Sequence, residues 1–195
     1  VVRDRMLSFA EEVCRGYDVD GIELDFLRHS CFFKSVAWGG DASAEELELM
    51  TGLMRRVRAM TEAAGRKKGR PLLVAARVPS STGFSRAIGL DVEQWLEEGL
   101  VDLLIVSGYF RLAPWKQAFA LGAQYDVPVY PCLSDARPES AAPPYHGLYR
   151  QSDAGWRARA AQAWAAGAPG LYLFNFRKFQ WDTPLLNQLG DPEIL

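Results

Sequence analysis

Apolar residues recur along the chain with two alternating patterns. Helical spacing predicts helices over residues 2–17, 43–65, 90–99, 114–126, 153–167 and 183–190. Between them lie short, nearly continuous apolar runs over 20–27, 71–79, 100–110, 127–133 and 170–176, which we interpret as strands buried on both faces. Strict alternation of strand and helix is typical of an α/β protein with a parallel sheet and right-handed crossovers.

The ends of several predicted elements carry their own signals. Ser43 and Glu46 form a capping box ahead of the longest predicted helix, and Gly65 with the basic run RKKGR ends it. Asp91 is the expected N-cap of the next helix, and Pro114 falls in the first turn of the one after it. Since neither a repeat nor a low-complexity linker interrupts the pattern, we expect residues 1–195 to form a single domain.

Such a sheet can close in two ways. An open, doubly wound sheet usually has a glycine-rich turn after its first strand, whereas the turn here reads LRHSCFF, without a GxGxxG or P-loop motif. A (β/α)8 barrel of the TIM type carries its function on the loops after the strands, and the longest loops here, 28–41 and 134–151, follow the first and fourth strands. A barrel has eight strands, so we expect this chain to hold only the C-terminal five βα units.

Composition excludes several classes of function. The chain is 49% hydrophobic and 24% charged, as in an ordinary soluble domain, and its net charge of −2 offers no basic surface for nucleic acid. No apolar run reaches the roughly 18 residues of a membrane-spanning helix. The three cysteines form no CxxC pair, so we expect neither a metal site nor another cofactor. The chain lacks an initiating methionine and begins inside a predicted helix, from which we expect it to be part of a longer polypeptide.

The stretch VDGIELDFL places two carboxylates inside a buried strand. Burying an unpaired carboxylate costs several kcal/mol, so Glu23 and Asp25 need either satisfied partners or a chemical role. Side chains alternate along a strand, so if residues 22, 24 and 26 pack against helices, both carboxylates face the barrel interior. Arg77, near the carboxyl end of the second strand, is the natural partner, and we expect it to pair with the deeper Glu23.

Three segments resemble a known group of proteins. The segment DGIELDFLRH resembles the fourth-strand signature of glycoside hydrolase barrels, most of all the bacterial family 10 glycosylhydrolase-like proteins. The segments GLDVEQWLEEGLVDLLIVSGYF and VPVYPCLSDAR are similar to the later strands of that group. The resemblance implies hydrolysis of a glycosidic bond in an oligo- or polysaccharide, and a secreted or periplasmic location.

Chitinase-type barrels of family 18 supply a sharper comparison. Their fourth strand reads D-G-x-D-x-D-x-E, and the final glutamate is the acid. In this sequence Asp20, Gly21 and Asp25 match, Glu23 replaces an aspartate, and Leu27 stands at the position of the acid. The comparison therefore favours a barrel strand more than it favours chitinase chemistry.

Glycoside hydrolysis usually uses two carboxyl groups on either side of the scissile bond. We expect Asp25 to be the central catalytic group, with Asp135, which follows the fourth strand, or Glu23 as the second. Candidate substrate-binding side chains follow the strands toward the same edge of the sheet: Arg77, His29, Tyr109, Asn175, Trp38 and Trp181. Two alternatives stay open, namely a purely structural network of Glu23, Asp25 and Arg77, and a carbohydrate-binding barrel without catalysis.

Overall fold

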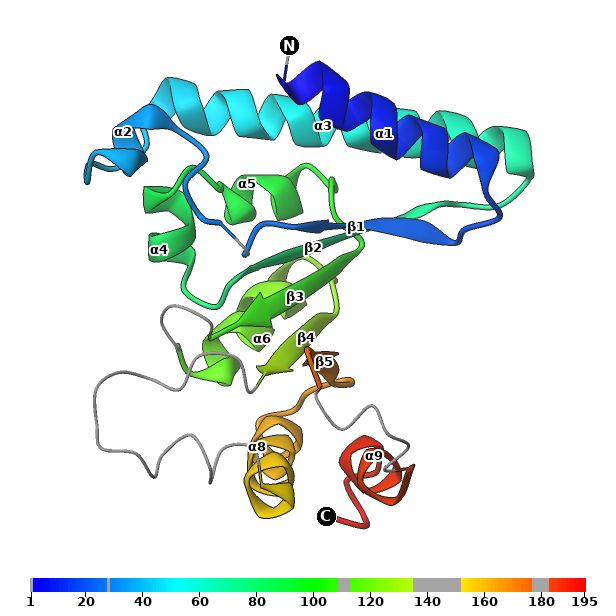
Figure 1. The fold of residues 1–195 in the computed structure, drawn as a ribbon, viewed down its shortest axis with the longest axis vertical. Coiled ribbons are helices and arrows are strands. Elements are labelled where there is room, and N and C mark those ends of the chain that lie inside the picture. Colours follow the sequence, from blue (N-terminus) through cyan, green and yellow to red (C-terminus); the bar gives the residue numbers. More distant parts are fainter. Residues whose placement is uncertain (1, 28, 109–112, 135–151, 177–182) are drawn as a thin grey trace.

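The computed structural model describes residues 2–27, 29–108, 113–134, 152–176 and 183–195. In these residues a parallel sheet contains five strands in the order β1-β2-β3-β4-β5. The strands are β1 (Gly21–Asp25), β2 (Leu73–Pro79), β3 (Leu103–Ser107), β4 (Val129–Ser134) and β5 (Tyr172–Phe174). The order never reverses, in contrast to a doubly wound sheet. Figure 1 shows that the sheet is curled.

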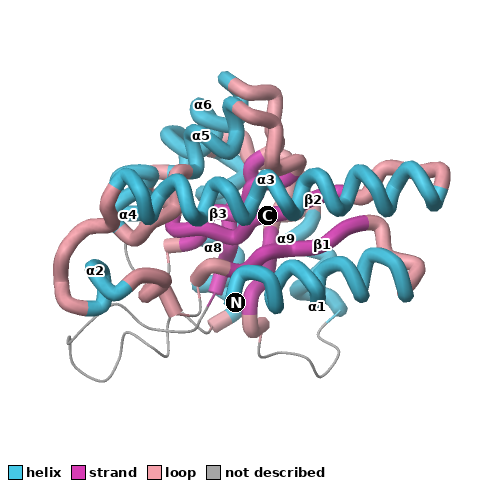
Figure 2. Tube along the Cα trace, turned by 90° about the horizontal axis from the view of Figure 1, so that it is seen from above, coloured by secondary structure: helices cyan, strands magenta, loops and turns pink. Residues whose placement is uncertain are grey.

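Helices follow the strands and cover the convex face of the sheet (Figures 1 and 2). The longer ones are α1 (Val2–Gly16), α3 (Ala44–Lys68), α6 (Trp115–Gln124), α8 (Asp153–Ala165) and α9 (Thr183–Gly190). The shorter ones are α2 (Lys34–Ala37), α4 (Thr82–Ala87) and α5 (Val92–Glu97). The architecture is a half-barrel of βα units, which confirms the predicted fold class of a partial TIM-type barrel.

The predicted start of α3 is confirmed, but its predicted end at Gly65 is wrong, because the helix continues to Lys68 and is capped by Gly69 in a left-handed conformation. Both halves of the Ser43–Glu46 capping box are formed at the start of α3. Asp91 precedes α5 but its side chain makes no capping hydrogen bond, because its carboxylate pairs with Arg86 instead. Pro114 is the N-cap of α6 rather than a residue of its first turn. Sequence periodicity missed α2 and α4, which are too short to show a repeating apolar stripe.

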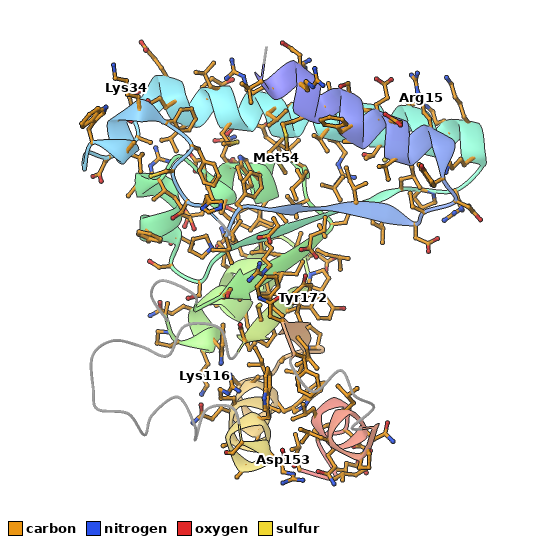
Figure 3. All side chains as sticks on the ribbon, in the orientation of Figure 1. Arg15, Lys34, Met54, Lys116, Asp153 and Tyr172 are labelled. Atoms are coloured by element: carbon orange, nitrogen blue, oxygen red, sulfur yellow. The ribbon has the colours of Figure 1, made fainter. Side chains whose placement is uncertain are left out.

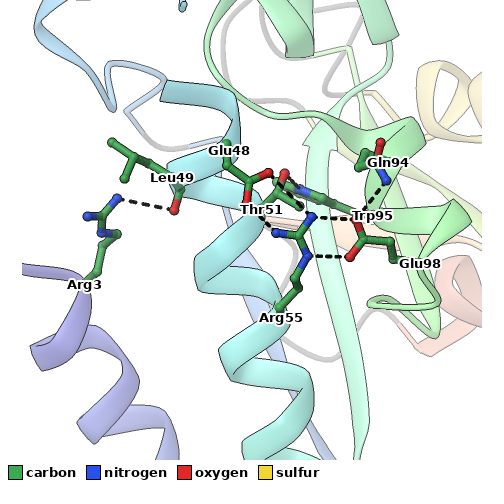
Figure 4. A network of polar contacts seen from close by, with 8 residues as sticks. All are labelled: Arg3, Glu48, Leu49, Thr51, Arg55, Gln94, Trp95 and Glu98. Atoms are coloured by element: carbon green, nitrogen blue, oxygen red, sulfur yellow. Dashed lines mark hydrogen bonds and ion pairs between the residues drawn. The ribbon is translucent and has the colours of Figure 1, made fainter. Parts of the chain in front are cut away.

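The main core lies between the convex face of the sheet and helices α3 and α5. Alternate strand residues point into it, and Met54 reaches it from α3 (Figure 3). Trp95 of α5 is fully buried, and its indole Nε1–H donates to Thr51 Oγ1 of α3 at 3.0 Å (Figure 4). The apolar members from the strands are Ile22, Leu24, Val74, Ala76, Val78, Leu104, Val106 and Val129. The predicted orientation of β1 toward the helices is therefore confirmed.

A second apolar cluster joins the last strands to the C-terminal helices. Trp156 of α8 packs edge-on against Phe176, which follows β5, with 4.9 Å between the ring centroids. Leu185 and Leu189 of α9 are buried in the same cluster. Both clusters lie on the convex side, so the opposite, concave face of the strands is left for other residues.

Candidate functional site

Polar side chains occupy the concave face toward the carboxyl ends of the strands. The strand register places Asp25 of β1 opposite Arg77 of β2. It also places Ser107 of β3 opposite Cys132 of β4, which is in turn opposite Tyr172 of β5. In barrels of this type the carboxyl ends of the strands carry the functional residues, so this polar face is the candidate site.

Asp25 and Arg77 form an ion pair at the centre of this face. Asp25 Oδ2 accepts from Arg77 Nη1 at 2.8 Å, and Asp25 Oδ1 accepts from the Leu27 backbone N–H at 2.9 Å. The Arg77 side chain is 1% exposed and that of Asp25 is 35% exposed. The buried guanidinium thus fixes a carboxylate that remains open to solvent.

Aromatic rings from β5 complete the surroundings of Arg77. The guanidinium carbon lies 3.6 Å from the centroid of the Phe174 ring and 5.9 Å from that of Tyr172. Such stacking stabilises a desolvated guanidinium. Its Nε and Nη2 atoms make no hydrogen bond to any residue that the structure describes.

The expected pairing of Glu23 with Arg77 is wrong. Glu23 instead accepts a hydrogen bond at its Oε1 from the hydroxyl of Tyr172, at 3.1 Å. The reason is register, because β2 presents Ala75 opposite Glu23 and Arg77 opposite Asp25. Glu23 and Tyr172 come from the two ends of the sheet, β1 and β5, so their contact spans the concave face (Tyr172 is labelled in Figure 3).

The two carboxyl groups have different electrostatic surroundings. Desolvation of the Glu23 carboxyl raises its pKa, although the residue as a whole is exposed, and the charge of Asp25 adds to this. The hydrogen bond from Tyr172 and the charge of Arg77 oppose the rise in the Glu23 pKa. Desolvation and the neighbouring Glu23 in turn raise the pKa of Tyr172 to about 12. Glu23 therefore keeps a proton to higher pH than an ordinary glutamate does.

A buried thiol lies beside this pair. Burial raises the pKa of Cys132, and the neighbouring Arg77 and Ser107 partly oppose that rise. Both Cys132 and Ser107 are almost completely buried. They form the floor of the concave face next to the guanidinium, and solvent hardly reaches either side chain.

Three of the remaining predicted residues are described by the structure, and none of them has a hydrogen bond or ion pair with Asp25 or Arg77. His29 is exposed in the segment after β1, and Trp38 is 81% exposed at the end of α2. Asn175 directly follows β5, exposed and with a left-handed φ of 49°. Asp135, Tyr109 and Trp181 lie outside the described residues, so their expected roles stay predictions.

Sequence analysis missed the aromatic side of the site. Tyr172 and Phe174 contact Glu23 and Arg77, yet they read as ordinary members of an apolar strand. The signal was present in the alternation of GLYLFNF, because Leu171 and Leu173 pack against the helices and so turn the two aromatic residues to the other face.

Two further findings concern the described part of the chain only. It contains no group of three His, Cys, Asp or Glu side chains that could hold a metal ion. Nor is any helix within it long and apolar enough to cross a membrane.

Comparison with known proteins gives similarity in fold. No protein-family model matches the sequence, and no curated protein does. Among solved structures, a glycoside hydrolase family 18 N-acetylglucosaminidase from Paenibacillus barengoltzii is similar, with a TM-score of 0.64 and 13% identity over 96% of this chain and 75% of that one. The glycoside hydrolase domain of PgaB (BpsB) from Bordetella bronchiseptica has a TM-score of 0.59 and 11% identity, over 96% of this chain and 60% of that one.

A protein with different chemistry shares the fold as well. Orotidine 5'-monophosphate decarboxylase from Methanocaldococcus jannaschii has a TM-score of 0.51 and 13% identity, over 95% of this chain and 72% of that one. At such identities the likeness is one of fold, and a fold of this kind hosts many reactions. The chain thus has a TIM-barrel-like fold that glycoside hydrolases share, and its resemblance to the family 10-like group stays a prediction.

Proposed function

We propose that this chain is part of a glycosidase that hydrolyses a glycosidic bond of an oligo- or polysaccharide on the concave face. The observation that carries the proposal is the Asp25–Arg77 pair, in which a buried guanidinium holds a solvent-facing carboxylate at the carboxyl end of a barrel strand. A carboxylate held in this way is fixed in its orientation, as a nucleophile or a base toward water requires. Arg77 acts here as a positioning residue.

The second carboxyl group is Glu23 or Asp135. Glu23 is two residues from Asp25 on the same face of β1, which corresponds to about 6.6 Å along the strand. This spacing lies near the range for two cooperating carboxyl groups, roughly 5–9.5 Å between glycosidase classes. Its raised pKa suits a proton donor. Asp135 follows β4 in the sequence, and its role is proposed from that position alone.

A carbohydrate-binding barrel without hydrolysis is the second candidate. Leu27, which stands at the acid position of the chitinase-type motif, is 1% exposed and belongs to the core. Both carboxylate oxygens of Asp25 already accept hydrogen bonds within the chain. These two observations favour a site that holds a sugar without cleaving it.

The test is an assay of the full-length protein on a panel of oligosaccharides, in which hydrolysis is measured by the release of reducing ends. We expect Asp25→Asn to lower kcat/KM by about 10²–10⁴-fold while sugar binding, measured by calorimetry, is retained. The matched control is Asp102→Asn, because Asp102 pairs with Arg58 at 3.0 Å and accepts from the Val74 backbone N–H at 2.6 Å, at the opposite end of the strands. The control should lose stability but not turnover.

The outcomes separate the two candidates. Binding without turnover by the unmodified protein would overturn the hydrolase and support the binding barrel. Turnover that Asp25→Asn and Asp102→Asn reduce equally would remove Asp25 from the chemistry. Glu23→Gln and Asp135→Asn, assayed side by side, then identify the second carboxyl group by the larger fall in kcat.

A further inference from the structure

Helix α1 exposes an apolar stripe to solvent. Five large hydrophobic side chains with helical spacing are 38–76% exposed: Val2, Met6, Phe9, Val13 and Tyr17. They make up half of the ten exposed large hydrophobic side chains that the described residues contain. A single-sided stripe of this kind indicates a contact surface rather than scattered surface residues.

The rest of α1 already has partners. Its Cys14 is completely buried in a small cluster with Ala64 and Leu72. The Arg3 guanidinium donates to the Leu49 carbonyl of α3 at 3.3 Å, and Asp4 pairs with Arg56 at 2.8 Å. These contacts fix the rotation of the helix, so its exposed stripe cannot turn inward.

An open strand edge lies beside α1. β1 ends the described sheet, with β2 as its paired neighbour. The Phe26 N–H donates to the Arg77 carbonyl at 3.0 Å, and the Leu73 N–H donates to the Asp20 carbonyl at 2.9 Å. In parallel pairing, every second residue of a strand directs its backbone N–H and C=O to the neighbour on one side, and the residues between direct theirs to the other side.

The even-numbered residues of β1 therefore face β2. The backbone N–H and C=O groups of Gly21, Glu23 and Asp25 point to the other side, toward the open edge. Unpaired strand edges of this kind are templates for a further strand. Figures 1 and 2 show α1 beside α3, along the margin where β1 ends the sheet.

We propose that a parallel β-strand, formed by polypeptide that leads into α1, docks on this margin. Its backbone pairs with Gly21, Glu23 and Asp25, and its helix-facing side chains pack under the α1 stripe. The order strand–α1–β1 then completes one more right-handed βαβ unit, the same connection that the rest of the sheet uses. Each crossover helix in such a fold covers two strands, and in the described part of the chain β1 is the strand that α1 chiefly contacts.

The dimensions of the two surfaces agree. From Val2 to Tyr17 the stripe rises about 22 Å at roughly 1.5 Å per residue. A strand of typical length, about 17–20 Å, runs beneath a stripe of that size. One strand therefore covers both the apolar side chains and the open backbone groups.

The test is amide hydrogen exchange in the full natural gene product. We expect the amides of Gly21, Glu23 and Asp25 to exchange within about tenfold of those of Ile22 and Leu24, which bond to β2. The double substitution Met6→Gln with Phe9→Gln should then speed exchange at the three edge amides at least tenfold. Leu186→Gln is the control, because Leu186 is a comparably exposed apolar residue on α9.

Three results would overturn the proposal. Edge amides that exchange at least 100-fold faster than those of Ile22 and Leu24 would show an open edge. A symmetric dimer in sedimentation, dissociated by Phe9→Gln, would make a second copy of the chain the occupant. Equal effects of the double substitution and of Leu186→Gln would show that the α1 stripe has no special contact.

Discussion

The two faces of the same five strands differ in what they bury. On the convex face, Val74 and Leu104 are buried among apolar side chains of the helices. On the concave face, Arg77 is buried just as deeply but lies against a carboxylate, a thiol and two aromatic rings. Residues that alternate along one strand therefore pack in the apolar core on one face and build the polar site on the other.

The difference between the two faces indicates which buried residues have a functional role. A buried apolar residue stabilises the fold by its transfer out of water, whereas a buried ion pair contributes little net stability. Two guanidinium nitrogens of Arg77, Nε and Nη2, have no hydrogen-bond partner among the described residues, at a further energetic cost. Its arrangement is therefore better explained by the orientation of Asp25 than by stability.

The largest predicted effect belongs to the convex face. Leu104→Ala should lower the free energy of unfolding by about 2–5 kcal/mol, because Leu104 is fully buried and the substitution leaves a cavity. Ser107→Ala, at an equally buried position three residues further along β3 but on the concave face, should cost about 1 kcal/mol or less. Urea unfolding of both variants measures the difference, and equal losses would contradict the contrast between the faces.

The second prediction concerns the two members of the ion pair. Asp25→Asn should lower the free energy of unfolding by about 1–3 kcal/mol, because it leaves a buried guanidinium without its counter-charge. Arg77→Met should cost less, because Asp25 is partly exposed and can be hydrated when its partner is lost. Thermal unfolding of the two single variants tests this order, and a larger loss for Arg77→Met would reverse the assignment of the buried partner.

Glu23 should have the smallest effect, and its sign depends on pH. Its pKa in the folded state is raised above the ordinary value of 4.5, so protonation favours the folded state. This contribution is complete below about pH 4.5 and is lost as the pH rises through the raised pKa. Glu23→Gln should therefore be at least as stable as the unmodified protein at pH 7, by less than about 1 kcal/mol because the residue is exposed.

The pH dependence supplies its own check. The advantage of Glu23→Gln should shrink on going from pH 7 to pH 4, as followed by chemical unfolding at both values. A variant that is clearly less stable than the unmodified protein at pH 7 would show that the Tyr172 hydrogen bond outweighs desolvation of the carboxyl group.

The fold could be predicted from sequence because periodicity is a property of single segments. The helix over 43–65 and the alternating direction of β1 side chains follow from apolar spacing and the Ser43 capping box. Strand ends were less accurate, since the apolar run continues to Leu27 while β1 ends at Asp25. The two residues beyond the strand are buried as well, so hydrophobicity alone does not mark where pairing stops.

The site was predicted only in part because register is a property of two segments. The alternation of side chains along the strand correctly predicted that Glu23 and Asp25 lie on the concave face. It does not predict which of them is level with Arg77. Contact between Glu23 and Tyr172 depends on the curl of the whole sheet, about which no local pattern carries information. The direction of the β5 aromatic side chains could have been predicted from the alternation of GLYLFNF, but their contacts with Glu23 and Arg77 could not.

The most direct test of the central claim is chemical-shift mapping of the isotopically labelled full-length protein during titration with oligosaccharides. The account predicts that a bound sugar shifts the backbone amide of Leu27, which donates to Asp25, together with the side-chain Nε–H of Arg77 and the amide of Tyr172. Amides of the convex core, such as those of Val74 and Leu104, should stay unchanged. Shifts confined to the convex side, or saturable binding that leaves the Leu27 amide and the Arg77 Nε–H untouched, would contradict a carbohydrate site on the concave face.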